Sequence, residues 1–77
     1  MDIKEFIENF AGEFDETPMD SFTPDTDYKQ LDEWNSLTAL SIVAMVDEVY
    51  NKTITGADLR NHTTIQELAD FIEKKKK

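Results

Sequence analysis

Apolar side chains in this chain recur three and four residues apart, and no segment alternates apolar with polar residues over the length of a strand. The first stripe consists of Ile3, Phe6, Ile7, Phe10 and Phe14. Asp2 stands where a helix cap is expected, with Glu5 three residues later, and Pro18 closes the segment. Because helical spacing recurs and strand spacing does not, we predict an all-α chain.

A second helix is expected over about residues 36–50, where apolar residues cover more than one side. Such a helix lies among neighbouring elements or exposes apolar groups to a partner. A short third helix starts at Thr55 and ends near residues 61–62, and a fourth starts at Thr64, because each threonine begins a capping-box pattern. We therefore expect a bundle of three long helices and one short third helix. Its predicted core consists of Phe6, Phe10, Phe14, Val43, Val46, Ile65, Leu68 and Ile72.

Residues 15–35 do not fit this pattern, since they contain two prolines, seven acidic residues and no long periodicity. A connection of this length in a small domain is expected to be anchored or functional. Thr23-Pro24-Asp25 is a candidate for a single helical turn, with proline at its first position. The candidates to anchor the loop to the core are Phe22, Tyr28, Leu31 and Trp34.

Length and charge limit the class of protein. The 77 residues allow one domain, residues 1–77, with a small core. The chain has no cysteine, which excludes disulfides, a thiolate nucleophile and cysteine-based zinc sites. The net charge is −9, distributed as −11 over residues 1–48 and +2 over residues 49–77. A field of this sign repels nucleic acid and anionic membranes and attracts basic protein surfaces.

No apolar run approaches the roughly 20 residues that span a bilayer, and none follows Met1 as in a signal peptide, so we expect a cytoplasmic protein. An enzyme has little support, because His62 is the only histidine and no glycine-rich phosphate loop is present. Asp25 begins a segment like an EF-hand loop, but Lys29 occupies a ligand position and Ser36 replaces the bidentate glutamate. We expect His62 to be structural or solvated, the acidic loop to be a solvated face, and no metal site.

Ser36 lies where the long loop meets the second helix. On one interpretation, Asn35 or Ser36 simply caps the free backbone N–H groups of that helix. On the other, a phosphodiester attached to the Ser36 hydroxyl meets those N–H groups and the positive end of the helix dipole. The residues by themselves leave both interpretations open.

Here the chain resembles a family, the acyl carrier proteins with their peptidyl and aryl carrier relatives. The family motif is Asp-Ser-Leu at the start of the second helix of a four-helix bundle, and this chain has Asn35-Ser36-Leu37. The likeness continues through residues 37–50, which match the apolar second helix with its acidic end, and through residues 64–72, which match the fourth helix. The resemblance covers nearly the whole chain, including the long first loop.

The resemblance implies that Ser36 carries 4′-phosphopantetheine, with Asn35 and Leu37 beside the attachment point. A phosphopantetheinyl transferase supplies the cofactor from coenzyme A, and the thiol of the arm then holds acyl-type intermediates as thioesters. The other implied partners are an acyl-loading ligase or acyltransferase and downstream synthases. The protein itself catalyses nothing, and the missing cysteine fits because the reactive sulfur arrives with the cofactor.

Members of the family dock on basic patches of their enzymes through the second helix. The matching positions in this chain are Asp32, Glu33, Leu37, Met45, Asp47 and Glu48. This chain departs from the family at Asn35, which keeps the cap of the usual acidic residue and loses its charge, and at Trp34, which replaces a small residue and is expected to pack the loop against the bundle. Together with Thr38 and Ser41, these departures favour a specialised biosynthetic carrier over a housekeeping one.

A second hypothesis, from another class, is a cofactor-free acidic helical module that binds and regulates a basic partner protein. Both hypotheses predict the same fold and charge, and they differ at Ser36, which only the carrier requires. A third hypothesis, a hydrolase or metal enzyme, requires activity or bound metal from the purified chain alone. Because no heptad seam is present, we expect a monomer, and its charge predicts that it binds neither nucleic acid nor membrane.

Overall fold

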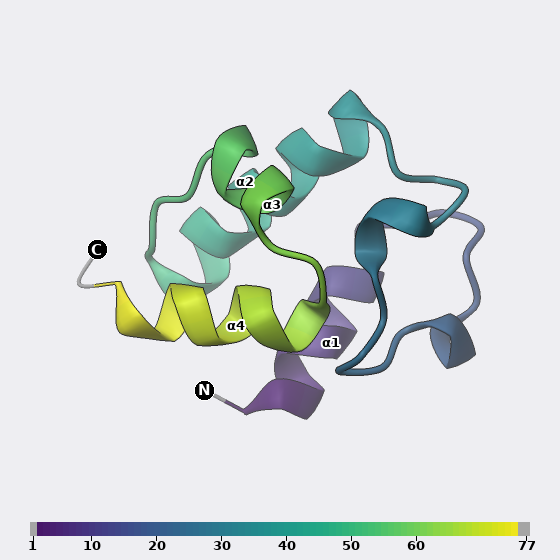
Figure 1. Ribbon diagram of the computed structural model, residues 1–77, viewed down its shortest axis with the longest axis horizontal. Coiled ribbons are helices and arrows are strands. Elements are labelled where there is room, and N and C mark those ends of the chain that lie inside the picture. Colours follow the sequence, from purple (N-terminus) through teal and green to yellow (C-terminus); the bar gives the residue numbers. More distant parts are fainter. Residues whose placement is uncertain (1, 76–77) are drawn as a thin grey trace.

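The computed structural model describes residues 2–75 and consists of four α-helices, with a long connection between the first and the second (Figure 1). The helices are α1 (Ile3–Ala11), α2 (Ser36–Tyr50), α3 (Gly56–Asn61) and α4 (Ile65–Lys74). Two 3-10 turns, η1 (Met19–Ser21) and η2 (Tyr28–Gln30), lie in the long connection. The described residues contain no strand, only an isolated bridge between Asp27 and Thr64. The predicted all-α bundle with a short third helix is confirmed.

Side chains that cap the free backbone N–H groups determine where α3 and α4 begin. In α3 the predicted capping box is complete, because Thr55 Oγ1 accepts from the Asp58 amide and the Asp58 carboxylate accepts from the Thr55 amide. In α4 only half of the box forms: Thr64 accepts from the Glu67 amide, while Glu67 accepts from the amide of Thr63. Both helices therefore begin where the sequence predicts.

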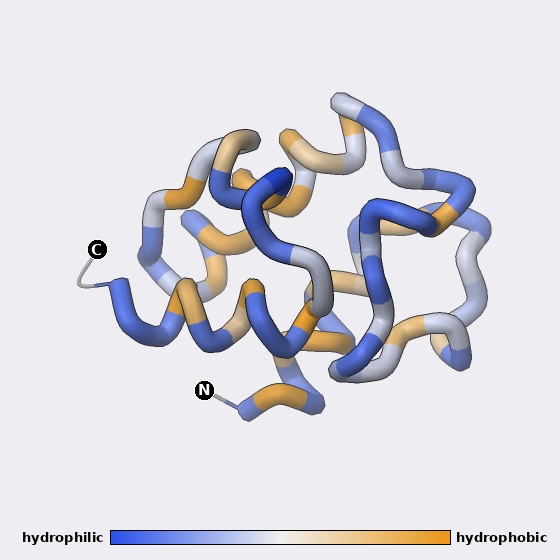
Figure 2. Tube along the Cα trace, in the orientation of Figure 1, coloured by the Kyte–Doolittle hydropathy of each residue, from blue (hydrophilic) through white to orange (hydrophobic). Residues whose placement is uncertain are grey.

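The core lies where α1 meets α2 and α4, and α3 packs against α2. Figure 2 shows hydrophobic and hydrophilic residues interspersed along α1 and α4, as expected for helices with one buried side. The expected core residues that are buried are Phe6, Phe10, Phe14, Val46, Ile65, Leu68 and Ile72. The expectation for Val43 is wrong, since this residue is only partly buried and α2 turns Ile42, Met45 and Val46 inward.

Aromatic side chains anchor the long loop, residues 12–35, to the core. Phe22 and Tyr28 are buried, and the Trp34 ring stacks parallel to that of Phe10, with 6.5 Å between the centroids and an angle of 5° between the planes. The ring centroids of Trp34 and Tyr28 are 4.9 Å apart. Leu31 is partly buried and packs against the same core. Trp34 therefore packs the loop against the bundle, as predicted, and the loop forms the end of the molecule on the right of Figure 1.

The helical turn predicted at Thr23-Pro24-Asp25 is wrong. The Thr26 amide donates to the Thr23 carbonyl at 3.0 Å, which closes a single turn around Pro24 and Asp25 without starting a helix. The helical turns of the loop are η1 and η2, on either side of it. Proline is favoured at the second position of a β-turn as well as at the first position of a helix. The local pattern therefore did not distinguish the two.

Candidate functional site

Ser36 is the first residue of α2, and its side chain is exposed. Asn35 is the N-cap, with its side-chain oxygen accepting from the Thr38 amide at 2.9 Å. The Thr38 hydroxyl donates to the Glu33 carbonyl at 2.8 Å, which fixes the backbone before the helix. Among residues 2–75 the Ser36 hydroxyl has no hydrogen-bond partner. The bond that caps the helix thus comes from Asn35, which leaves the serine oxygen accessible.

The charge around the start of α2 differs from that of the other helices. The first turns of α1, α3 and α4 contain an acidic residue, Glu5, Asp58 and Glu67 respectively, whereas the first turn of α2 contains none. Carboxylates near a helix start offset the positive end of its dipole. Because α2 has no such carboxylate, the backbone N–H groups beside Ser36 keep their preference for an external anion.

An open groove of about 270 Å³ runs beside Ser36, between the start of α2 and helix α3. Trp34, Asn35 and Ala39 line it on one side, and Leu59 and Arg60 line it on the other. The groove therefore combines apolar walls with a guanidinium group. A ligand that consists of a phosphodiester and a long uncharged arm fits such a lining. The guanidinium suits the anionic phosphodiester, and the apolar walls suit the uncharged arm. The residues present at Ser36 fit 4′-phosphopantetheine.

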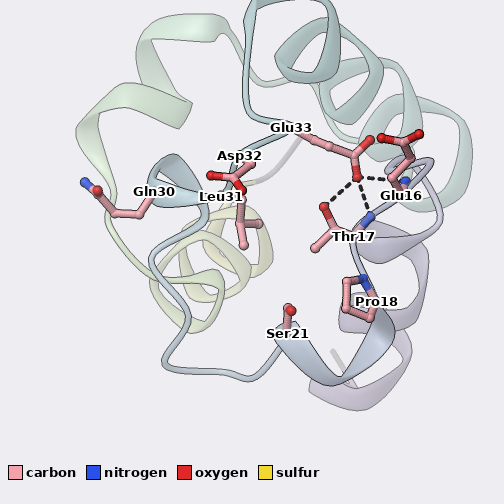
Figure 3. Close-up of a pocket in the computed structure, with 8 residues that line it drawn as sticks. All are labelled: Glu16, Thr17, Pro18, Ser21, Gln30, Leu31, Asp32 and Glu33. Carbon is pink, nitrogen blue, oxygen red and sulfur yellow. Dashed lines mark hydrogen bonds between the residues drawn. The ribbon is translucent and has the colours of Figure 1, made fainter.

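Glu33, expected at the docking surface, is instead bound to the loop, as Figure 3 shows. Its carboxylate accepts from the amides of Asp15, Glu16 and Thr17 at 3.0, 2.8 and 2.5 Å, and from the Thr17 hydroxyl at 2.5 Å. These hydrogen bonds, that of the Thr17 hydroxyl above all, hold the pKa of the Glu33 carboxyl below its ordinary value. Glu33 thus fastens the beginning of the loop to the residues just before α2.

The two acidic residues before α2 therefore have different surroundings. Asp32 is exposed, as the docking hypothesis requires, whereas the Glu33 carboxylate is already occupied by the loop. Both line an open cavity of about 460 Å³, together with Thr17 and Pro18 (Figure 3). The sequence pattern gave no sign of this difference, because the amides that bind Glu33 lie 16 to 18 residues earlier in the chain.

One face of α2 points away from the core, and we call it the α2 outer face. It consists of Leu37, Leu40, Ala44, Asp47 and Glu48, all exposed. Leu37 is 76% and Leu40 is 64% exposed, so two large apolar groups lie on the surface close to Ser36, and the two carboxylates follow at the far end of the helix. Four of the expected docking residues, Asp32, Leu37, Asp47 and Glu48, are thus accessible to a partner.

Met45 does not belong to this face. It was expected as an apolar docking contact, but only 5% of it is exposed, because it lies in the core beside Val46. Leu40, one turn after Ser36, is exposed on this face and was not among the residues expected there. The signal was present in the breadth of the apolar surface of α2, which indicated exposed apolar groups without showing which residues they are.

The remaining polar groups have structural surroundings. His62 contacts the ring of Phe71 at 4.6 Å between centroids, and its Nδ1 lies 2.7 Å from the Asp58 carbonyl, so of the two surroundings expected for it, structural or solvated, these contacts are the structural one. Within residues 2–75 no group of three or more His, Asp or Glu side chains is placed to hold a metal ion. None of the helices in that range is long and apolar enough to cross a membrane.

Comparison with known proteins agrees with this geometry. A family model described as phosphopantetheine attachment site matches residues 5–72. No curated protein sequence matches the chain. Members of the matched family carry covalent 4′-phosphopantetheine, are not enzymes, and interact with a phosphopantetheinyl transferase and with synthases or acyltransferases. Since the match extends over most of the four-helix structure, the chain belongs to the phosphopantetheine-attachment family, the carrier domains that include the acyl carrier proteins.

Proposed function

We propose that the protein, with residues 1–77 acting as one carrier domain, holds acyl-type intermediates as thioesters on a 4′-phosphopantetheine arm attached to Ser36. The observation that carries the proposal is the position of Ser36: an exposed hydroxyl at the first position of α2, beside an open groove and without a hydrogen-bond partner among residues 2–75. Ser36 Oγ attacks the phosphorus of the coenzyme A diphosphate that bears the pantetheine, the bond from this phosphorus to the bridging oxygen breaks so that adenosine 3′,5′-bisphosphate leaves, and the hydroxyl proton passes to the transferase. When attached, the arm supplies the thiol that forms the thioester.

We further propose that partner enzymes contact the α2 outer face. Leu37 and Leu40 provide apolar contacts close to Ser36, while Asp47 and Glu48 meet basic groups further away. Surface ion pairs contribute roughly 0–1 kcal/mol each, so the complexes are transient and sensitive to salt. A carrier that visits several enzymes in turn requires this kind of binding. Asn35 and Trp34 in place of the residues usual before the serine favour a specialised pathway.

The test is the intact mass of the purified apo protein after incubation with coenzyme A, Mg²⁺ and a broad-specificity phosphopantetheinyl transferase. We expect one phosphopantetheine on the wild type, none on Ser36→Ala, and one on Ser41→Ala, which removes a hydroxyl from the same helix. Because the chain has no cysteine, a thiol assay of the product counts the cofactor thiol alone. Modification of Ser36→Ala would show that another residue carries the arm.

The second hypothesis, an acidic module that regulates a basic partner without a cofactor, is supported by the net charge of −9. The same experiment separates it from the carrier. If several transferases leave the folded wild-type protein unmodified, the carrier proposal fails and the acidic module becomes the better account of the α2 outer face.

A further inference from the structure

Arg60 lies on the opposite side of the groove from Ser36. It is the single arginine of the chain and, within residues 2–75, the only charged residue that lines this groove. Within residues 2–75 its guanidinium forms no ion pair and no hydrogen bond. The guanidinium packs close to Gly56, which lies one turn earlier in α3: a Cβ atom added to Gly56 would lie 3.5 Å from Arg60 Nη1. A guanidinium at the wall of a groove, without a partner, is placed to receive an anion from that groove.

The long loop fixes the backbone that carries Arg60. The Arg60 carbonyl accepts from Lys29 Nζ at 3.0 Å, and the neighbouring Leu59 carbonyl accepts from the Tyr28 hydroxyl at 2.5 Å. Tyr28 and Leu59 are both completely buried, so this connection between the loop and α3 is part of the core. The backbone at the end of α3 is therefore held against the loop, while the Arg60 residue itself is exposed.

Two carboxylates close in sequence to residues of the groove are already engaged. Asp58, in the same helix, accepts from the Thr55 amide, and Glu33, just before α2, is bound by the loop. No acidic residue lies in the first turn of α2. In a chain with a net charge of −9, the groove beside Ser36 thus combines a cation with a helix start whose dipole is not offset.

We propose that Arg60 is a phosphate-binding residue: its guanidinium pairs with the phosphodiester that joins the arm to Ser36 and holds the arm in the groove between α2 and α3. The inference rests on the proposed function, since it requires modification at Ser36. A guanidinium suits this task because its fork of N–H donors matches two phosphate oxygens at once. Arg60 is a positioning residue on this account. It favours the arm lying along the groove over the arm extending into solvent.

The uniqueness of Arg60 gives a direct spectroscopic test. In ¹⁵N-labelled protein the side-chain Nε–H resonance of arginine belongs to one residue only. We expect it to shift and its hydrogen exchange to slow when the apo protein becomes the holo protein with a free thiol. Inorganic phosphate added to the apo protein at the same concentration distinguishes an attached phosphodiester from a general anion site. The proposal is overturned if the resonance in the holo protein is identical to that in the apo protein.

A stability measurement with variants tests the same contact independently. An exposed ion pair in a domain of this size changes the unfolding midpoint by about 1–8 °C. We expect attachment of the arm to raise the midpoint of wild type and Arg60→Lys more than that of Arg60→Gln, at low salt only. Lys4→Gln removes one positive charge on α1, away from the groove lining, and should behave like wild type. Equally reduced shifts in Arg60→Gln and Lys4→Gln would mean that net charge alone acts, and a wild-type shift in both would mean that Arg60 does not contact the arm; either result overturns the proposal.

The two proposals fail in distinguishable ways. Mass spectrometry of each sample states whether the arm is present before any comparison is made. If no variant and no wild-type protein acquires the arm, both proposals are wrong. If the arm is present and the Arg60 resonance moves only after a carboxylate-bearing cargo is loaded, the guanidinium recognises the cargo, and the phosphate assignment is wrong.

Discussion

Helices α2 and α4 use their apolar residues differently. In α4, Ile65, Leu68, Ala69 and Ile72 are buried, and the polar residues between them face outward. In α2, buried residues occupy one side, yet Leu37 and Leu40 are more than half exposed on another. The apolar surface of α4 matches what the core covers, whereas that of α2 exceeds it. This exposed apolar surface on α2 is the observation behind our proposal that partner enzymes bind the α2 outer face.

The two helices also begin differently. Thr64 caps α4 and Glu67 lies in its first turn, so α4 provides its own negative charge at that end. Asn35 caps α2 without a charge, and the nearest preceding carboxylate, that of Glu33, is bound to the loop. The start of α2 is therefore available for a phosphodiester, while the start of α4 is satisfied within the chain.

Leucine-to-alanine substitutions in the two helices should separate them most strongly. Leu68→Ala leaves a cavity in the core, so we expect it to lower the free energy of unfolding by about 2–5 kcal/mol. Leu40→Ala removes a side chain that is mostly in solvent, and its effect should stay within about 0.5 kcal/mol. Urea denaturation followed by circular dichroism measures both. A Leu40→Ala variant as unstable as Leu68→Ala would show that the outer face of α2 is packed against something in this chain.

The same Leu40→Ala variant should be a poorer substrate for partner enzymes although its stability is nearly unchanged. If partners bind the α2 outer face, truncation of a central apolar contact lowers the kcat/KM of a partner enzyme for the holo protein by about 5–30-fold. Val49→Ala is the matched control, because Val49 is also half-exposed on α2 but lies about 120° around the helix from Leu37. Steady-state kinetics with the transferase or a loading enzyme distinguishes them. Equal losses in the two variants would place the contact elsewhere.

The difference between the two helices explains how far the sequence predicts the structure. The stripes of α1 and α4 are one-sided, so Phe6, Phe10 and Leu68 could be assigned to the core from spacing alone. In α2 every side carries apolar residues, and spacing cannot determine which side turns inward. Both errors follow from this: Val43 was expected in the core and is only partly buried against it, and Met45 was expected on the surface and is buried.

The candidate site was predictable in part for a similar reason. Local pattern placed Ser36 at a helix start, with Asn35 as a possible cap, since capping depends on residues close in sequence. Contacts between distant residues left no local signal. The binding of Glu33 by residues 15–17 and the position of Arg60 across from Ser36 depend on how the loop and α3 pack, which only the folded chain determines.

The adjacent acids before α2 allow a smaller comparison. Glu33→Gln removes the charge that the loop amides bind, so we expect a lower unfolding midpoint in urea at pH 7, while Asp32→Asn leaves it nearly unchanged. Because the pKa of Glu33 is lowered in the folded state, its contribution is complete above its ordinary value of 4.5 and is lost as the pH falls through the folded value. Stability curves of wild type and Glu33→Gln should therefore converge on acidification. A constant gap between pH 7 and 3 would exclude this origin.

The smallest effects are expected at the acidic end of the α2 outer face. Asp47→Asn and Glu48→Gln each remove one exposed charge, so each should lower the kcat/KM of a partner by about two- to fivefold at low salt, mainly through slower association. Glu8→Gln, an exposed acid on α1, changes the net charge equally and is the control. Near 1 M salt the Debye length falls to about 3 Å, so the differences should vanish, whereas the loss in Leu40→Ala should persist. A salt-independent loss at Asp47 would mean that its carboxylate makes a buried contact with the partner. Persistence of the Leu40→Ala loss at high salt, together with disappearance of the Asp47 and Glu48 effects, would show that apolar burial near Ser36 holds the partner and that charge at the far end guides its approach.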